Sequence, residues 1–160
     1  MTEAVTQLLN LLDVEQLEVD LFRGIGAGGE TTIRIFGGQV IAQALAAAYK
    51  TVEGRLCHSL HAYFIRPGDP SKPVIYAVDP ARDGGSFTTR RVTALQNGKQ
   101  ILNLAASFHI DEPGWAHQHE IPEVKAPDAL VSRDVLLRQL APKLDGRLRV
   151  EFTRERPFEI

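Results

Sequence analysis

Residues 39–52 restrict the fold more than any other part of the chain. Nearly every side chain there is apolar or small, and alanine occupies positions 42, 44, 46, 47 and 48. The segment therefore lacks the wide polar stripe of a surface helix, which predicts a helix buried on most sides. Alanine side chains let a neighbouring backbone approach closely. We therefore expect a core helix enclosed by a sheet.

Strand-like segments follow this helix. Residues 56–66 and 73–82 are rich in β-branched and aromatic side chains, and a turn rich in Pro and Gly separates them. Residues 86–95 and 99–110 flank an Asn-Gly pair, which favours the positive φ angles of a two-residue hairpin turn. We predict three or four antiparallel strands after the helix.

Shorter elements precede the helix. Residues 4–12 place apolar side chains at the spacing of an amphipathic helix. Residues 17–24 alternate as one half-buried strand, and residues 32–36 resume that pattern after a glycine-rich turn. Glycines 24, 26 and 29 also match a dinucleotide-binding loop, but a strand pattern follows where that motif needs a helix. We therefore interpret them as a turn.

The last third of the chain has a different composition. Residues 111–128 are rich in Pro, Glu, His and Asp, which predicts a surface linker. Residues 131–144 fit a short amphipathic helix, and residues 147–160 read as a final strand. Because strands are stabilised by pairing, this strand predicts a second unit that follows it or once followed it.

Composition excludes several classes of protein. At 160 residues with 44% hydrophobic and 24% charged side chains, the chain fits one globular domain. A net charge of -2 gives no broad positive field for nucleic acid. No apolar stretch approaches the roughly 20 residues of a membrane span, and no secretory signal is recognisable. Cys57 is the single cysteine, so we expect a reducing, cytoplasmic location.

Three segments carry a resemblance to a known family: FGGQVIAQALAAA, the run from HSLHAYFIRPGDPSKP through RDGGSFTTRRV to AASFH, and EFTRERPFE. Together they resemble the amino-terminal half of bacterial thioesterase II (TesB-like) enzymes. The resemblance implies an α+β hot-dog fold, in which an antiparallel sheet wraps a long central helix, as one half of a double hot-dog. It also implies hydrolysis of medium- to long-chain acyl-CoA to free acid and CoA, without a cofactor.

The resemblance also divides the chain. It implies an N-terminal helix within residues 1–16, a hot-dog domain over 17–110 and a linker over 111–130. Residues 131–160 would then hold a helix and the first strand of a truncated second repeat. In that family the Asp, the Thr or Ser and the Gln that activate water lie mainly in the second repeat, which this chain lacks. The chain alone is therefore expected to be a weak or inactive enzyme.

Gly37, Gly38 and Gln39 open the predicted core helix. Unpaired backbone N–H groups and the positive end of the helix dipole lie at such a start, which favours an oxyanion or a phosphate. Alternatively, the glycines only permit tight packing between strand and helix. In the first two turns Gln39 and Gln43 are the only polar side chains, and an amide cannot act as a general base.

Histidines offer the remaining candidate for acid–base chemistry. His58 cannot pair with Cys57, because adjacent strand residues point to opposite faces. His58 alone stays a weak catalytic candidate and a pocket-lining candidate beside the central helix, and a structural role is the alternative. His117 and His119 lack a third ligand nearby, so no metal site is predicted.

Basic residues lie near two glycine- and proline-containing turns. Arg66, Lys72 and Arg82 flank these turns and could meet the phosphates of CoA, with Arg90 and Arg91 nearby. The alternative is a solvated sheet edge with ordinary ion pairs.

We therefore predict an acyl-CoA thioesterase half that binds acyl-CoA and uses water as the nucleophile. The alternative is a non-catalytic acyl-CoA-binding or pairing subunit. A sheet edge without its second repeat also predicts a homodimer or larger oligomer.

Overall fold

The computed structural model describes residues 2–26, 33–153 and 158. Two compact units are present in it. The larger unit runs from Leu9 to Pro113, and the smaller unit draws on residues 1–8 and 114–160. Helix α1 (Glu3–Leu12) confirms the amphipathic helix predicted near the start of the chain.

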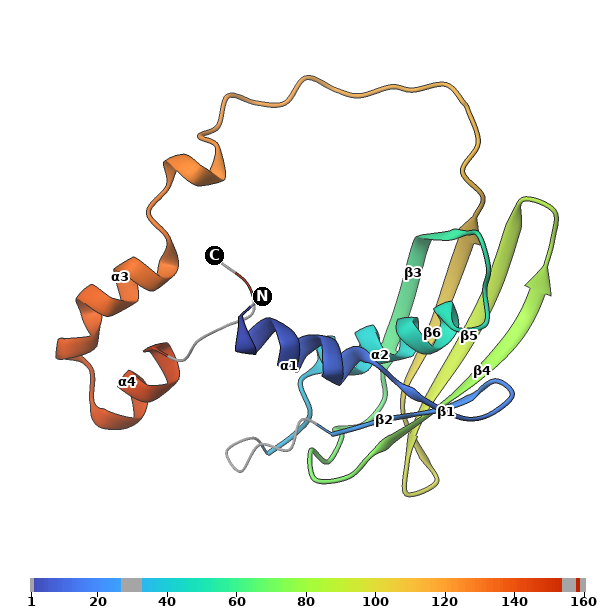
Figure 1. Cartoon of the computed structure of the whole chain (residues 1–160), viewed down its shortest axis with the longest axis horizontal. Helices are drawn as coiled ribbons and strands as arrows, with labels where there is room; N and C mark the ends of the chain where they lie inside the picture. Colours follow the sequence, from blue (N-terminus) through green and yellow to red (C-terminus); the bar gives the residue numbers. More distant parts are fainter. Residues whose placement is uncertain (1, 27–32, 154–157, 159–160) are drawn as a thin grey trace. The chain divides into compact units, whose positions relative to one another are not determined.

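A single antiparallel sheet and one helix form the larger unit. Helix α2 (Gly37–Tyr49) lies against six strands in the order β1-β2-β4-β5-β6-β3, and the sheet curves around it (Figure 1). The prediction of a core helix followed by three or four antiparallel strands is confirmed, and the structure has four. The strands are β1 (Glu15–Glu18), β2 (Leu21–Gly24), β3 (Leu56–Phe64), β4 (Val74–Asp83), β5 (Phe87–Gln96) and β6 (Lys99–His109).

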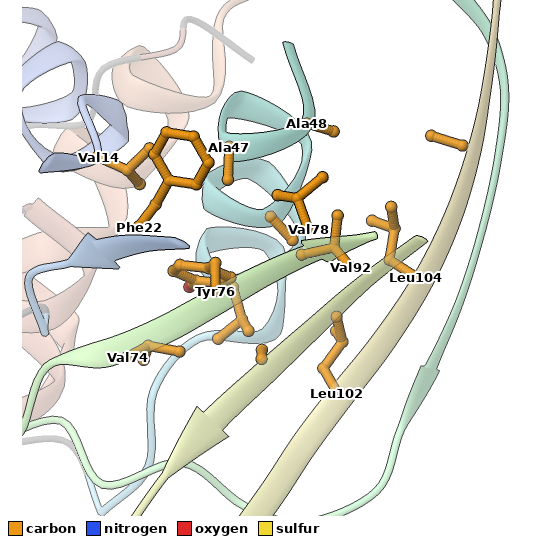
Figure 2. Close-up of a cluster of buried hydrophobic side chains, with 14 of the residues drawn as sticks. Val14, Phe22, Ala47, Ala48, Val74, Tyr76, Val78, Val92, Leu102 and Leu104 are labelled. Atoms are coloured by element: carbon orange, nitrogen blue, oxygen red, sulfur yellow. The ribbon is translucent and has the colours of Figure 1, made fainter. Parts of the chain in front are cut away.

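The hydrophobic core lies between α2 and the sheet. Ala47 and Ala48 of the helix have no exposed surface, and they face the sheet residues Val92 and Leu104 (Figure 2). Alanine keeps the helix backbone close to the strands, so the apolar strand side chains pack against it in one buried cluster. This burial is the main stabilising contribution of the larger unit.

One polar network crosses this core. The fully buried amide of Gln43 donates through Nε2 to the carbonyls of Leu11, at 2.6 Å, and Ile25, at 3.1 Å. Its Oε1 accepts from the Tyr76 hydroxyl at 2.7 Å, and burial raises the pKa of that phenol. A Cβ atom at Gly24 would lie 2.5 Å from the same Oε1, so glycine is required there. Gln43 is therefore a structural residue.

The hairpin between β5 and β6 fixes the register of the sheet. Asn97 has φ 50° and Gly98 has φ 70°, which confirms the predicted two-residue turn. Next to the turn, Leu95 pairs with Gln100. Ala94 then pairs with Leu102, so the register is shifted by one residue along the rest of the two strands. That shift decides which side chains share a face.

Three local predictions for the larger unit were wrong. Residues 17–24 form two strands of a hairpin, because Asp20 turns the chain with φ 59°. Residues 33–36 are not a strand, since the Ile35 amide donates to the carbonyl of Gly68 in a loop. Helix α2 ends at Tyr49, short of residue 52. Most of the predicted glycine turn falls at residues 27–32, outside the described residues.

The smaller unit contains short helices. They are η1 (Pro127–Ala129), α3 (Arg133–Leu140), η2 (Ala141–Lys143) and α4 (Gly146–Thr153). The strand predicted over 147–160 is wrong for residues 147–153, which are helical because the Asp145 carboxylate accepts from the Leu148 amide as an N-terminal cap. Its remainder lies outside the described residues, apart from residue 158. Within the described chain, no helix is both long and apolar enough to cross a membrane.

Candidate functional site

A groove of about 890 Å³ opens where α2 begins. The loop after β3 and the segment before α2 form its walls, and most of its lining is apolar. The lining residues are Ile33, Arg34, Ile35, Phe36, Gly37, Val40, Phe64, Ile65, Arg66, Pro67, Gly68 and Ile101. Such a groove can hold an extended apolar chain.

The start of α2 contributes Gly37 to the lining of the groove, whereas the predicted residue Gly38 is not part of that lining. The amides of Gly37 and Gly38 lie at the first turn, where backbone N–H groups have no partner within the helix. Both glycines also allow close packing: a Cβ atom would lie 2.7 Å from the Phe64 ring at Gly37, and 2.5 Å from the Phe36 ring at Gly38. The packing interpretation therefore has direct support, and it does not exclude hydrogen-bond donation by these amides.

The predicted residue Gln39 does not line this groove. Its side chain is buried and donates to the Ile25 carbonyl at 3.1 Å. Arg66 does line the groove, and its Nη1 donates to the Gln100 carbonyl at 2.8 Å. Arg34 is the second charged residue of the described lining, and it was not predicted from the sequence. Two arginines beside an apolar groove suit a ligand with an apolar chain and an anionic end.

Acid–base chemistry is not available from the described lining of the groove. It contains no Asp, Glu or His side chain among the residues that the structure describes. Gln43 does not line the groove and is engaged in the core network. The described residues also contain no group of three or more His, Cys, Asp or Glu side chains placed to hold a metal ion.

His58 lies away from the groove. Its Nε2 atom is 2.8 Å from Ser107 Oγ, and its ring stacks edge-on against Phe87. Phe108, the neighbour of Ser107, packs on Tyr49 of α2. Because neighbouring strand residues point to opposite faces, Ser107 and the His58 ring lie on the face turned away from α2. The expectation that His58 lies beside the central helix was wrong.

A second pocket, of about 490 Å³, adjoins this histidine. Arg82 lies there, together with the β4–β5 hairpin. The lining residues are Arg82, Gly84, Gly85, Ser86, Phe87, Thr89 and Ser107. Arg82 was predicted from the sequence as a binding residue. Ser107 was not predicted, because only the strand register brings it to this pocket.

The three predicted basic residues do not form one cluster. Arg66 and Lys72 precede β4, whereas Arg82 lies near its other end, and a ten-residue strand spans roughly 30 Å. Lys72 forms an ion pair with Asp69 at 3.6 Å and lines neither pocket described above. Hydrogen bonds from Ser71 hold the pKa of Asp69 below its ordinary value.

Arg90 is a structural arginine. It is buried, and it donates to the hydroxyl and carbonyl of Thr51, just after α2, and to Asp83 at 2.8 Å. The hydrogen bond from Arg90 holds the pKa of Asp83 below its ordinary value. Through Arg90, Asp83 therefore ties the β4–β5 hairpin to the end of the core helix.

Comparisons with known proteins agree with this geometry. Residues 28–109 match the family model described as acyl-CoA thioesterase N-terminal domain. The chain is 40% identical to acyl-CoA thioesterase 2 of Haemophilus influenzae, over 100% of this chain and 56% of the relative. The chain thus spans little more than half of that relative.

Solved structures show the same correspondence. A crystal structure of an acyl-CoA thioesterase II from Mycobacterium marinum has a TM-score of 0.70 and 42% identity, covering 83% of this chain and 48% of the other. A hot-dog protein of unknown function from Alicyclobacillus acidocaldarius has a TM-score of 0.67 at 23% identity, covering 82% and 49%. The expected hot-dog fold is therefore confirmed, and this chain belongs to the acyl-CoA thioesterase N-terminal domain family.

Proposed function

We propose that this chain is the amino-terminal half of an acyl-CoA thioesterase, an enzyme that hydrolyses fatty acyl-CoA to free fatty acid and CoA. The observation that carries the proposal is the groove at the start of α2, which combines an apolar lining with Arg34, Arg66 and helix-start amides. The similarity to thioesterases from Haemophilus influenzae and Mycobacterium marinum supports the substrate class.

The chemistry assigned to this half is binding and electrostatic stabilisation. Attack of water on a thioester carbonyl places negative charge on its oxygen. Amides fixed at the start of a helix, as in Gly37 and Gly38, can stabilise such an oxyanion by roughly 3 kcal/mol per donor. Because water is the nucleophile, the reaction needs no cofactor and forms no covalent acyl-enzyme. The general base would come from the part of the relatives that this chain does not cover.

A non-catalytic acyl-CoA-binding or pairing subunit is the second candidate. The lack of a carboxylate or imidazole in the described lining of the groove favours this role for the chain by itself. The reading frame beyond codon 160 separates the two candidates, since a continuing second repeat favours the enzyme. In both cases residues 1–16, 17–110, 111–130 and 131–160 remain our proposed division of the chain.

Binding of an acyl chain in the groove can be tested with one exposed residue. Ile33 lines the groove and is 99% exposed, so Ile33→Asp should leave the fold intact and weaken binding of a medium-chain acyl-CoA about tenfold or more. Ile121, 77% exposed in the linker, provides the matched control Ile121→Asp. Equal affinities for both variants in calorimetry would remove the groove from the proposal.

Hydrolysis can be followed by release of the CoA thiol. We expect the 160-residue chain to give little signal above buffer, because the described lining of the groove holds no acid–base side chain. Positioned acid–base groups typically raise the rate about 10²- to 10⁴-fold. His58→Ala should change this signal little. Turnover above about 1 s⁻¹, the low end of ordinary enzymes, would show that this half holds a complete site.

We further propose that the chain pairs with another copy in the cytoplasm. The support is β3, an edge strand with apolar side chains left open to solvent at Leu56, Leu60 and Phe64. A long open edge strand invites pairing with another chain. The free thiol of Cys57 supports a reducing compartment.

A further inference from the structure

A row of polar side chains crosses three strands beneath the second pocket. Arg82 of β4 pairs with Thr89 of β5, and Thr89 pairs with Ser107 of β6. Residues directly opposite one another in a sheet project from the same face. The three side chains therefore lie side by side on the face away from α2 and line the pocket of about 490 Å³.

Arg82 is the one charged residue in the described lining of this pocket. Arg82 is exposed, and its guanidinium forms no ion pair or hydrogen bond with any other described residue. The adjacent carboxylate of Asp83 is already engaged by Arg90 and Thr88. Arg55 brings a further positive charge to the same hairpin. The carboxylate of Glu112 is also engaged, by His109 at 3.0 Å, so Arg82 remains available for an anion.

The hairpin that closes the pocket is held in place before any ligand arrives. Arg55 donates to the carbonyls of Gly84, at 2.7 Å, and Gly85, at 2.9 Å, and also to the Thr88 hydroxyl. The Gly84 amide donates to the Phe87 carbonyl at 2.8 Å. A Cβ atom at Gly84 would lie 2.9 Å from that carbonyl oxygen, so the close turn requires glycine. A fixed pocket loses less entropy when it binds.

An aromatic surface adjoins the arginine. Phe87 lines the pocket and is 51% exposed, and its ring centroid lies 4.3 Å from that of His109. Aromatic side chains of this kind stack on nucleobases. The volume also exceeds what a single phosphate needs, so the pocket has room for the group that a phosphate carries.

We propose that this pocket binds a phosphorylated nucleoside. Its phosphate lies against the Arg82 guanidinium, which presents paired donors to phosphate oxygens, with the Thr89 hydroxyl as a further donor. The Ser107 hydroxyl, 2.8 Å from His58 Nε2, also donates to the phosphate when it accepts from that ring nitrogen. Its base lies against Phe87. Free nucleotides and CoA both carry this chemistry, and in the second case the inference rests on the proposed function.

Calorimetry with adenosine 3′,5′-bisphosphate tests the pocket directly. Arg82→Gln should weaken binding about tenfold or more, because it removes the charged donors. Arg91→Gln is the matched control, since Arg91 is exposed on the same face and lines neither pocket. It should change the affinity less than threefold. Equal losses in both variants, or no loss in Arg82→Gln, would overturn the proposal.

The source of the nucleotide is decided by repeating the titration with CoA. A loss of CoA affinity in Arg82→Gln, parallel to the loss for the bisphosphate, assigns the pocket to CoA. A loss for the bisphosphate alone assigns it to a free nucleotide, and both results support the site. Because Ile33→Asp tests the acyl groove separately, a failure of the thioesterase proposal would not change the interpretation of the Arg82→Gln result.

Discussion

At the scale of single residues, the most informative side chains are polar groups in buried places. Gln43 and Arg90 are both more than nine-tenths buried, and each joins segments that are distant in the sequence. A buried polar group costs free energy unless it is hydrogen-bonded, and both side chains have partners. Their role is therefore to fix how α2 sits on the sheet.

Replacing Gln43 should destabilise the larger unit. Gln43→Leu leaves the Tyr76 hydroxyl and the Leu11 carbonyl without their partner, at about 3 kcal/mol in the free energy of unfolding, whereas the Ile25 carbonyl keeps its hydrogen bond from Gln39. Urea unfolding measures the loss. Tyr76→Phe removes only the hydroxyl and should cost about 1 kcal/mol. The double variant should lose less stability than the sum of the two single losses. A loss equal to that sum would contradict the hydrogen bond between Tyr76 and Gln43.

Asp83 makes stability depend on pH. Its folded-state pKa lies below the ordinary value of 3.8, chiefly because Arg90 donates to it. The contribution is therefore complete above about pH 4 and is lost as the pH falls through the lowered pKa. Asp83→Asn should flatten the decline of unfolding free energy between pH 4 and lower values, relative to the native chain. An unchanged acid profile would mean that the Asp83–Arg90 pair contributes nothing.

At the scale of elements, the β5–β6 hairpin depends on its two left-handed residues. Gly98→Ala introduces a Cβ atom at φ 70°, which should cost about 1–2 kcal/mol. Gly85→Ala is the control, because that glycine lies in the other hairpin with open space around the added Cβ and without a positive φ. Thermal unfolding should separate the two variants. Similar melting temperatures would show that the turn does not hold the register.

The length of β4 explains why the predicted phosphate cluster separates. Lys72 and Arg82 are close in sequence, but an extended strand carries the chain from one end of the sheet to the other between them. The strand itself was predicted from its β-branched and aromatic residues. Applying its rise per residue would have assigned the basic residues to two sites.

At the scale of the whole molecule, the two sheet edges differ. The β1 edge is short and carries Glu15 and Glu18, whereas the β3 edge has nine residues with exposed apolar side chains. Charged, short edges resist pairing, and long apolar edges favour it. We therefore expect association through β3.

Sedimentation at micromolar concentration should show a dimer or a larger species. Leu60→Glu places a carboxylate on the β3 edge and should shift the protein toward monomer. Leu17→Glu, on the equally exposed β1 edge, should leave the association unchanged. A stable monomer of the native chain would contradict pairing through β3.

The sequence alone determined the central helix, the four strands after it and the Asn97–Gly98 turn. These follow from local patterns: an apolar segment without a polar stripe, alternating strand residues and a dipeptide suited to positive φ. Three of the substrate-binding candidates predicted from the sequence, Gly37, Arg66 and Arg82, line pockets in the structure. Each of these lies next to a turn or a helix start that the sequence reveals.

Only the tertiary structure decided which residues share a site. The register shift at Ala94 places Ser107 opposite Thr89, whereas counting back from the turn alone would pair it with Thr88. A shift of one residue moves a side chain to the other face of the sheet, so no local pattern could assign Ser107 to the pocket of Arg82. Helix α4 likewise depends on a cap from Asp145 that its alternating sequence conceals. Contacts between distant segments are set by packing, and packing is a property of the folded chain.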